Sequence, residues 1–152
     1  MYILLTEDNY LSRELKRCLE RDDASCVLAS DTSDALEIIR SNMMSDNTFD
    51  LIFIFDILPG SAGNNLVPEV RSLETAYAVP SGRNSVIVLI SSEPDCDGQS
   101  STLRQGCDYC LSLPVDTLEL VMILEITASR KSEAVPPENS SFGMQVTNQL
   151  IF

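Results

Sequence analysis

The sequence contains no histidine, and its ten lysine and arginine residues are outnumbered by 23 aspartates and glutamates. The resulting net charge of −13 leaves no basic surface for nucleic acid, so we expect no nucleic-acid partner. Protein zinc sites are built mainly from cysteine and histidine. The absence of histidine and the presence of one CxxC motif, Cys107 to Cys110, therefore argue against a zinc site. The apolar runs are far too short to cross a bilayer, so we expect no membrane partner either.

The sequence also lacks a recognisable targeting segment. No basic region precedes the apolar stretch from Tyr2 to Leu5, and no cleavage site follows it, so we expect no signal peptide and a cytoplasmic location. The five cysteines are odd in number and irregularly spaced, which favours reduced thiols. With 152 residues and 44% apolar composition, the chain is expected to form one soluble domain with a sizeable core.

The segment from Phe49 to Gly63 carries the clearest structural signal. Leu51 to Phe55 is an unbroken apolar run, rich in β-branched and aromatic residues, which is typical of a parallel strand buried on both faces. Asp56 ends the run, and Pro59-Gly60 breaks the chain soon afterwards. A carboxylate at the C-terminal end of a parallel strand lies where open α/β sheets bind their ligands.

Other apolar runs and helical spacings predict a regular alternation of strands and helices. Four further strands are expected over Tyr2 to Thr6, Cys26 to Ala29, Ser85 to Ile90 and Tyr109 to Ser112. The first expected helix covers Leu11 to Leu19, and the second carries Ala35 to Ile39 after candidate caps at Asp31 to Ser33. A third begins near Asn64 or Asn65, which can tolerate Pro68 only in its first turn, and two more cover Glu93 to Gln105 and Thr117 to Ala128. This alternation predicts an α/β fold, with a parallel sheet covered on both faces.

Four segments of the sequence match one protein family in order and spacing. They are ILLTEDN at Ile3 to Asn9, Ser12 to Ile39, Asp50 to Gly63, and Gly106 to Asp116. Together they resemble response regulator receiver (CheY-like) domains. The resemblance covers about residues 1 to 129, and it leaves 130 to 152 as a flexible C-terminal tail. It implies a flavodoxin-like, doubly wound five-stranded parallel sheet in the order 2-1-3-4-5. It also implies a module that accepts a phosphoryl group from a histidine kinase on an aspartate, using bound Mg²⁺.

The resemblance assigns roles to four residues at the strand ends. Glu7 and Asp8, with Asp56, would hold Mg²⁺, and Ser91 would hydrogen-bond the phosphoryl group. When the chain is laid on the family pattern without gaps, however, Phe55 takes the acceptor position and Asp56 comes one residue late. A shift of one residue turns a strand side chain to the opposite face. A bulge in the strand, with a shorter loop after it, would bring Asp56 back to the acceptor position.

Two further positions depart from the family pattern. Leu113 stands where the family has a lysine that neutralises the phosphoryl group, and Cys110 stands where it usually has an aromatic switch residue. The resemblance also implies a cis peptide bond between Leu113 and Pro114. Without the lysine, converging carboxylates would repel one another, so we expect Mg²⁺ or Ca²⁺ to stabilise the domain.

These observations favour a receiver-like signalling module with impaired or absent phosphoryl acceptance, which is not an enzyme. Its output would pass through protein partners (a histidine kinase, a phosphotransfer protein or an output protein), and a homodimer stays open. The alternative is a Mg²⁺-dependent phosphoacceptor that is phosphorylated on Asp56. A third reading, an unrelated doubly wound nucleotide binder, is disfavoured because the first strand-to-helix turn, Glu7 to Tyr10, has no glycine to cradle a phosphate.

Overall fold

The computed structural model describes residues 1–21, 23–56, 63–91 and 106–133 of the chain. The chain divides into two units, Met1–Val115 and Asp116–Phe152. The elements of the first unit are β1 (Tyr2–Leu5), α1 (Tyr10–Glu20), β2 (Ser25–Leu28), α2 (Thr32–Met44), β3 (Leu51–Asp56), α3 (Gly63–Ala76), a 3₁₀ turn (Ser81–Arg83), β4 (Val86–Ser91) and β5 (Tyr109–Ser112).

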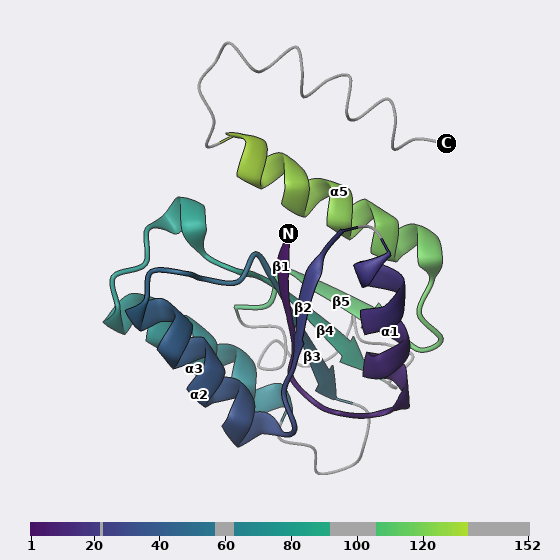
Figure 1. Cartoon of the computed structure of the whole chain (residues 1–152), viewed down its shortest axis with the longest axis horizontal. Helices are drawn as coiled ribbons and strands as arrows, with labels where there is room; N and C mark the ends of the chain where they lie inside the picture. The colour runs from purple at the N-terminus through teal and green to yellow at the C-terminus, as the bar shows by residue number, and fades with distance from the viewer. Residues whose placement is uncertain (22, 57–62, 92–105, 134–152) are drawn as a thin grey trace. The chain divides into compact units, whose positions relative to one another are not determined.

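The strands form one parallel sheet in the order β2-β1-β3-β4-β5 (Figure 1). This is the predicted order, so the predicted flavodoxin-like sheet is confirmed. The two central strands β3 and β4 pair residue for residue, from Leu51 opposite Val86 to Asp56 opposite Ser91. Every described residue of β4 is buried, as its continuous apolar sequence predicts for a central strand.

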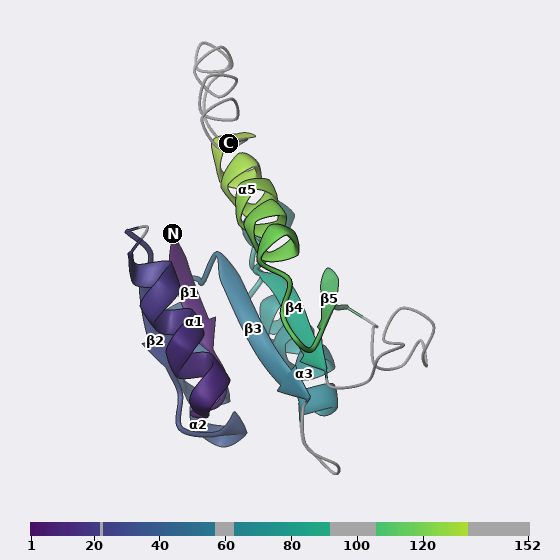
Figure 2. The same ribbon diagram turned by 90° about the vertical axis from the view of Figure 1, so that its right-hand side faces the viewer.

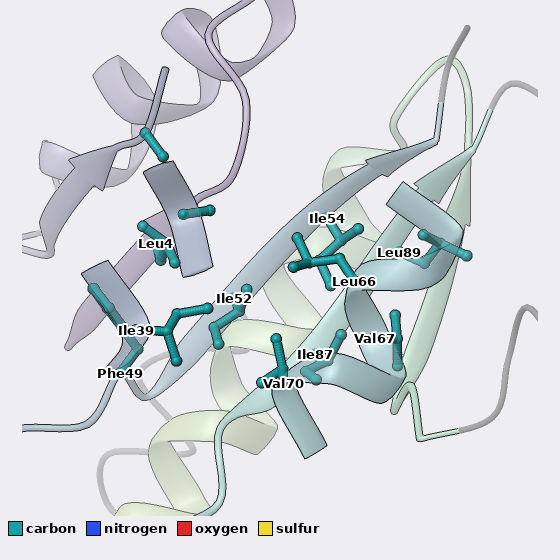
Figure 3. Close-up of a cluster of buried hydrophobic side chains, with 12 residues drawn as sticks. Leu4, Ile39, Phe49, Ile52, Ile54, Leu66, Val67, Val70, Ile87 and Leu89 are labelled. Carbon is teal, nitrogen blue, oxygen red and sulfur yellow. The ribbon is translucent and has the colours of Figure 1, made fainter. Parts of the chain in front are cut away.

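One face of the sheet packs against α2 and α3, and Figure 3 shows the resulting cluster. Strand side chains alternate between the two faces, so only every second residue of β3 and β4 belongs to this cluster. Its strand members are Leu4, Ile52, Ile54, Ile87 and Leu89, and its helix members are Ala35, Ile39, Leu66, Val67 and Val70. The helix residues recur at helical spacing, Ala35 with Ile39 on α2 and Leu66 with Val70 on α3.

The opposite face of the sheet lies on the side of α1 (Figure 2). The alternate residues of β3, including Phe53 and Phe55, are fully buried there, and α1 buries Leu15 and Leu19. The helical spacing of Leu11, Leu15, Cys18 and Leu19 predicts that Cys18 also lies on the buried face, but Cys18 is exposed. Ser12 is buried instead, because its hydroxyl takes part in the hydrogen bonds that begin α1.

Side-chain caps fix where α1 and α2 begin. Asn9 caps α1 by accepting a hydrogen bond from Ser12 N, and the Ser12 hydroxyl accepts one from Asn9 N. This reciprocal arrangement satisfies two backbone donors at the helix start. Asp31 caps α2 by accepting from Asp34 N, which confirms the predicted cap, and α2 continues past Ile39 to Met44.

The prediction for Pro68 was wrong. We expected it in the first turn of a helix that starts at Asn64 or Asn65, but α3 starts at Gly63 and Pro68 is its sixth residue. Proline inside a helix costs about 3 kcal/mol, because it removes a backbone donor. Leu66, Val67 and Val70 are almost completely buried, and each contributes about 1.5 to 3 kcal/mol. Burial of this apolar face therefore outweighs the cost of the proline.

The second unit contains α5 (Thr117–Glu133), in which Asp116 Oδ1 accepts from Leu118 N at the helix start. The helix runs five residues past its predicted end at Ala128. The predicted helix over Glu93 to Gln105 lies outside the described residues. Of the predicted flexible tail, 130 to 152, residues 130–133 instead continue α5, and residues 134–152 lie outside the described part of the chain. In the part of the chain that the structure describes, no helix is long and apolar enough to span a membrane.

Candidate functional site

The candidate site lies where β1, β3 and β4 end, because these three strands are neighbours in a parallel sheet. Thr6 follows β1 directly and is bonded to the neighbouring strand β3. Its backbone N–H and its hydroxyl both donate to Phe53 O, at 3.2 and 2.9 Å. Thr6 is almost completely buried. The turn that carries Glu7 and Asp8 is therefore attached to the adjacent strand β3.

Glu7 is hydrogen-bonded to the cap of α1. Glu7 Oε2 accepts from Asn9 Nδ2 at 3.0 Å. The oxygen of the Asn9 side-chain amide, Oδ1, accepts from Ser12 N at 2.8 Å. One asparagine side chain therefore starts the helix and holds the first of the two predicted metal-binding carboxylates.

Asp8 is paired with an arginine from α1. Arg13 Nε donates to Asp8 Oδ1 at 2.7 Å. The Arg13 side chain is 65% exposed and that of Asp8 is 38% exposed. The hydrogen bond and the negative charge of Asp8 raise the pKa of Arg13 above its ordinary value. The sequence analysis missed this residue, because the helical pattern placed Arg13 on the solvent side of α1. The sequence signal that could have identified Arg13 is its position in the first helical turn after the capping residue Asn9.

The end of β3 settles one question that the sequence left open. The suggested bulge is not present in the pairing of β3 with β4, because the register runs without interruption through Phe55 opposite Ile90 and Asp56 opposite Ser91. Phe55 is 1% exposed and belongs to the buried core. The side chain of Asp56 lies outside the described part of the structure, so its convergence with Glu7 and Asp8 stays a prediction.

Ser91 ends β4, and its side chain is buried. Its carbonyl oxygen accepts from Leu113 N at 3.0 Å, which brings the chain after β5 to the same edge of the sheet. The bond between Leu113 and Pro114 is cis, as predicted. The phosphoryl-binding role of Ser91 stays a prediction.

The described residues at this edge do not form a site for Mg²⁺. Among the side chains that the structure describes, which do not include that of Asp56, no three acidic or cysteine side chains gather as a metal site would need. The carboxylates of Glu7 and Asp8 each accept a hydrogen bond from a protein side chain. An ion that bound Asp8 through Oδ1 would have to displace Arg13, so the described donor set does not fit Mg²⁺ as it stands.

The cysteines differ in state. Cys18 and Cys26 are free thiols, and Cys107 Sγ donates to Tyr109 O at 2.9 Å, whereas Cys110 is disulfide-bonded. The expectation of reduced thiols throughout was therefore wrong for Cys110, and Cys96 lies outside the described residues. Burial, with a smaller contribution from the nearby charge of Glu20, raises the pKa of Cys26 to about 11.

A second polar cluster, which the sequence analysis missed, lies at the opposite edge of the sheet, where β4 and β5 begin. Arg71 of α3 is its centre, and the guanidinium donates to Glu74 Oε1, to Asp108 Oδ2 and to two backbone carbonyl oxygens, those of Ser85 and Gly106. Glu74 is 5% exposed and its other oxygen accepts from Ser85 N. These hydrogen bonds link α3 to the starts of β4 and β5. The cluster lies at the opposite edge of the sheet from the candidate site.

No protein-family model matches the chain, and no curated protein matches its sequence. Solved structures do match. A response regulator receiver domain (CheY-like) from Methylobacillus flagellatus is 25% identical, with a TM-score of 0.61 over 84% of this chain and 98% of that one. The chain has the receiver-domain fold.

Two other structures with the receiver-domain fold are similar to the same extent. One is a co-crystal structure of the Saccharomyces cerevisiae histidine phosphotransfer protein Ypd1 with the receiver domain of its downstream response regulator Ssk1. The match is 24% identical and has a TM-score of 0.63, over 82% of this chain and 87% of that one. The other is the response regulator TrrA of Thermotoga maritima in complex with Mg²⁺-BeF, which is 19% identical and has a TM-score of 0.61, over 83% and 97%. At these identities the likeness shows the fold alone.

Proposed function

We propose that this chain is a receiver-like signalling module of a two-component or phosphorelay system, that it acts through protein–protein contacts, and that its phosphoryl acceptance is impaired or absent. The receiver-domain fold supports the first part of the proposal. The order of residues at the end of β3 supports the last part.

The observation that carries this proposal is the burial of Phe55 in a strand without a bulge. Phe55 stands at the aligned acceptor position, pairs in regular register with Ile90 and is 1% exposed. A phenyl ring offers no oxygen for a phosphoryl group. Leu113, at the position of the family's lysine, offers no positive charge to neutralise one.

The alternative function, a Mg²⁺-dependent phosphoacceptor, is favoured by the register position of Asp56. Asp56 is paired with Ser91 on the next strand, and the backbones of paired residues lie about 5 Å apart. An aspartate and a hydroxyl residue therefore end two neighbouring strands together. A phosphoryl group on Asp56 would require that its carboxylate reach the solvent beyond that edge, and its charge would still lack a cation at position 113.

The deciding experiment is incubation with a small-molecule phosphodonor and millimolar Mg²⁺, followed by intact-mass spectrometry. Asp56→Asn is the test variant. Asp46→Asn is the matched control, because Asp46 is an exposed acid that pairs with Arg83 away from the site. We expect no phosphoryl adduct in the parent beyond the amount seen in Asp56→Asn. An adduct in the parent and in Asp46→Asn, but not in Asp56→Asn, would establish the alternative.

The partner class that we propose is a histidine phosphotransfer protein or a histidine kinase. The support is that the receiver domain of Ssk1, which has this fold, was crystallised with such a phosphotransfer protein. Calorimetric titration with purified phosphotransfer domains tests the proposal. A module that acts by contact alone should bind to the same extent with and without the phosphodonor. Binding that appears only after phosphorylation would contradict this proposal.

A further inference from the structure

We propose that Arg13 is a built-in counterion for the acidic turn, so that Mg²⁺ binds there only by displacing the guanidinium from Asp8. The inference deepens the proposed function and rests on it, since it concerns regulation of the same edge of the receiver fold. It assigns a role to a residue that neither the sequence pattern nor the fold comparison singled out.

The start of α1 holds Arg13 in place. Arg13 N donates to Asn9 O at 3.1 Å, which makes it part of the first helical turn, and the reciprocal bonds between Asn9 and Ser12 fix where that turn begins. From this position the side chain reaches back to Asp8, and Nε lies 2.7 Å from Oδ1. A guanidinium keeps its positive charge throughout the working pH range, so the charge on Asp8 is compensated without an ion.

The neighbouring carboxylate is engaged as well. Glu7 Oε2 accepts from Asn9 Nδ2, and the orientation of that amide is fixed because its oxygen caps the helix. An ion that took both carboxylates would break the Arg13 contact and the Asn9 contact together. Mg²⁺ also gives up its own water shell reluctantly, so competition from a fixed internal cation should weaken its binding measurably.

The size of this competition follows from the exposure of the pair. Arg13 is 65% exposed, and an ion pair in solvent contributes only a small amount to the stability of the folded state. Removing such a competitor should tighten ion binding roughly two- to fivefold. The effect is small, so the experiment needs a control with the same change in net charge.

Arg17 provides that control. It lies one turn further along α1, is 64% exposed and pairs with Glu14 at 3.5 Å, away from the acidic turn. Arg13→Gln and Arg17→Gln therefore change the charge of the same helix equally, at nearly equal exposure. Only the first substitution removes the donor to Asp8.

The test is calorimetric titration of Mg²⁺ into the parent, Arg13→Gln, Arg17→Gln and the double variant Arg13→Gln with Asp8→Asn, at fixed ionic strength. We expect Arg13→Gln to bind Mg²⁺ roughly two- to fivefold more tightly than both the parent and Arg17→Gln. The added Asp8→Asn change should remove the gain. In thermal unfolding without the ion, Arg13→Gln should lower the midpoint by about 1 to 3 °C, and millimolar Mg²⁺ should restore it.

Equal Mg²⁺ affinity in Arg13→Gln and Arg17→Gln would overturn the inference. It would also be overturned if Mg²⁺ raised the midpoint of the parent as much as that of Arg13→Gln. Failure of the proposed function is a separate result, because it is read as a phosphoryl adduct on Asp56. An adduct together with tighter Mg²⁺ binding in Arg13→Gln would reject the proposed function and support the counterion role.

Discussion

Arg71 and Asp108 join α3 to the start of β5 through a contact of 2.8 Å between Nη2 and Oδ2. The same carboxylate oxygen accepts from Ile87 N, in β4, at 2.8 Å. One side-chain pair therefore links a helix and two neighbouring strands. The two residues are 37 positions apart in the sequence, so the link closes a long stretch of chain.

Arg71→Ala should lower the free energy of unfolding by about 2 to 4 kcal/mol. The reason is that Glu74, which is almost fully buried, would lose its charged partner, whereas Asp108 is partly exposed and water would screen it. Urea denaturation at 25 °C measures the change. Arg71→Lys should fall between the parent and Arg71→Ala, because an ammonium cannot reproduce the forked contacts of a guanidinium.

Arg83→Ala is the control for this measurement. Arg83 pairs with Asp46 at 3.1 Å, but both side chains are mostly exposed, so the loss should stay below about 0.5 kcal/mol. Equal losses in Arg71→Ala and Arg83→Ala would mean that the buried cluster contributes nothing beyond an ordinary surface pair.

Gly106→Ala should destabilise the protein by about 1 to 3 kcal/mol. Gly106 has a φ of +90°, and an added Cβ would lie 3.0 Å from Cγ of Arg71. Gly82→Ala is the matched control, since a Cβ at Gly82 would meet no heavy atom within 4 Å. Thermal unfolding of the two variants should therefore separate them, and a Gly106→Ala midpoint equal to that of Gly82→Ala would contradict the structural account.

Phe55→Ala should cost about 3 to 5 kcal/mol, because it leaves a cavity in the buried centre of the sheet. Phe55→Asp should cost more, since it adds an unpaired charge at the same buried position. Denaturant titration of both variants gives the comparison. If Phe55→Asp were as stable as the parent, position 55 would be open to solvent, and the argument against phosphoryl acceptance would fail.

The raised pKa of Cys26 predicts a loss of stability at alkaline pH. Its folded-state value of about 11 exceeds the ordinary 9.0, so the folded chain holds the thiol proton more tightly than the unfolded chain does. The contribution is fully present below pH 9 and is lost as the pH rises from about 9 to 11. The urea midpoints of the parent and of Cys26→Ala should converge as the pH rises across that range. The parent loses the contribution of the protonated Cys26 thiol, whereas the variant has no thiol at this position to lose. Parallel curves would contradict the prediction.

The strands could be predicted from the sequence because burial leaves a simple signal. Leu51 to Phe55 and Val86 to Ile90 carry no polar residue, and strands buried on both faces need none. Asp31 was predicted as a cap for the equally local reason that short polar side chains bond the next helical turn.

The ion pairs could not be predicted in the same way. Arg71 meets Asp108 only because the parallel sheet brings the beginnings of β4 and β5 together, and Arg13 meets Asp8 only because a capped turn reverses the chain between them. In the sequence, both arginines fall at helix positions that usually face the solvent. Their partners are decided by the three-dimensional path of the chain rather than by local pattern.

The uninterrupted pairing of β3 with β4 also determines which mutations could supply an acceptor at position 55. A substitution at that position places a charge inside the core, whereas moving Asp56 back by one register position requires the strand to lose a residue. Single substitutions therefore give this module no short route to a phosphoryl acceptor at position 55, because a new carboxylate there would be buried and a shift of register needs a change of chain length.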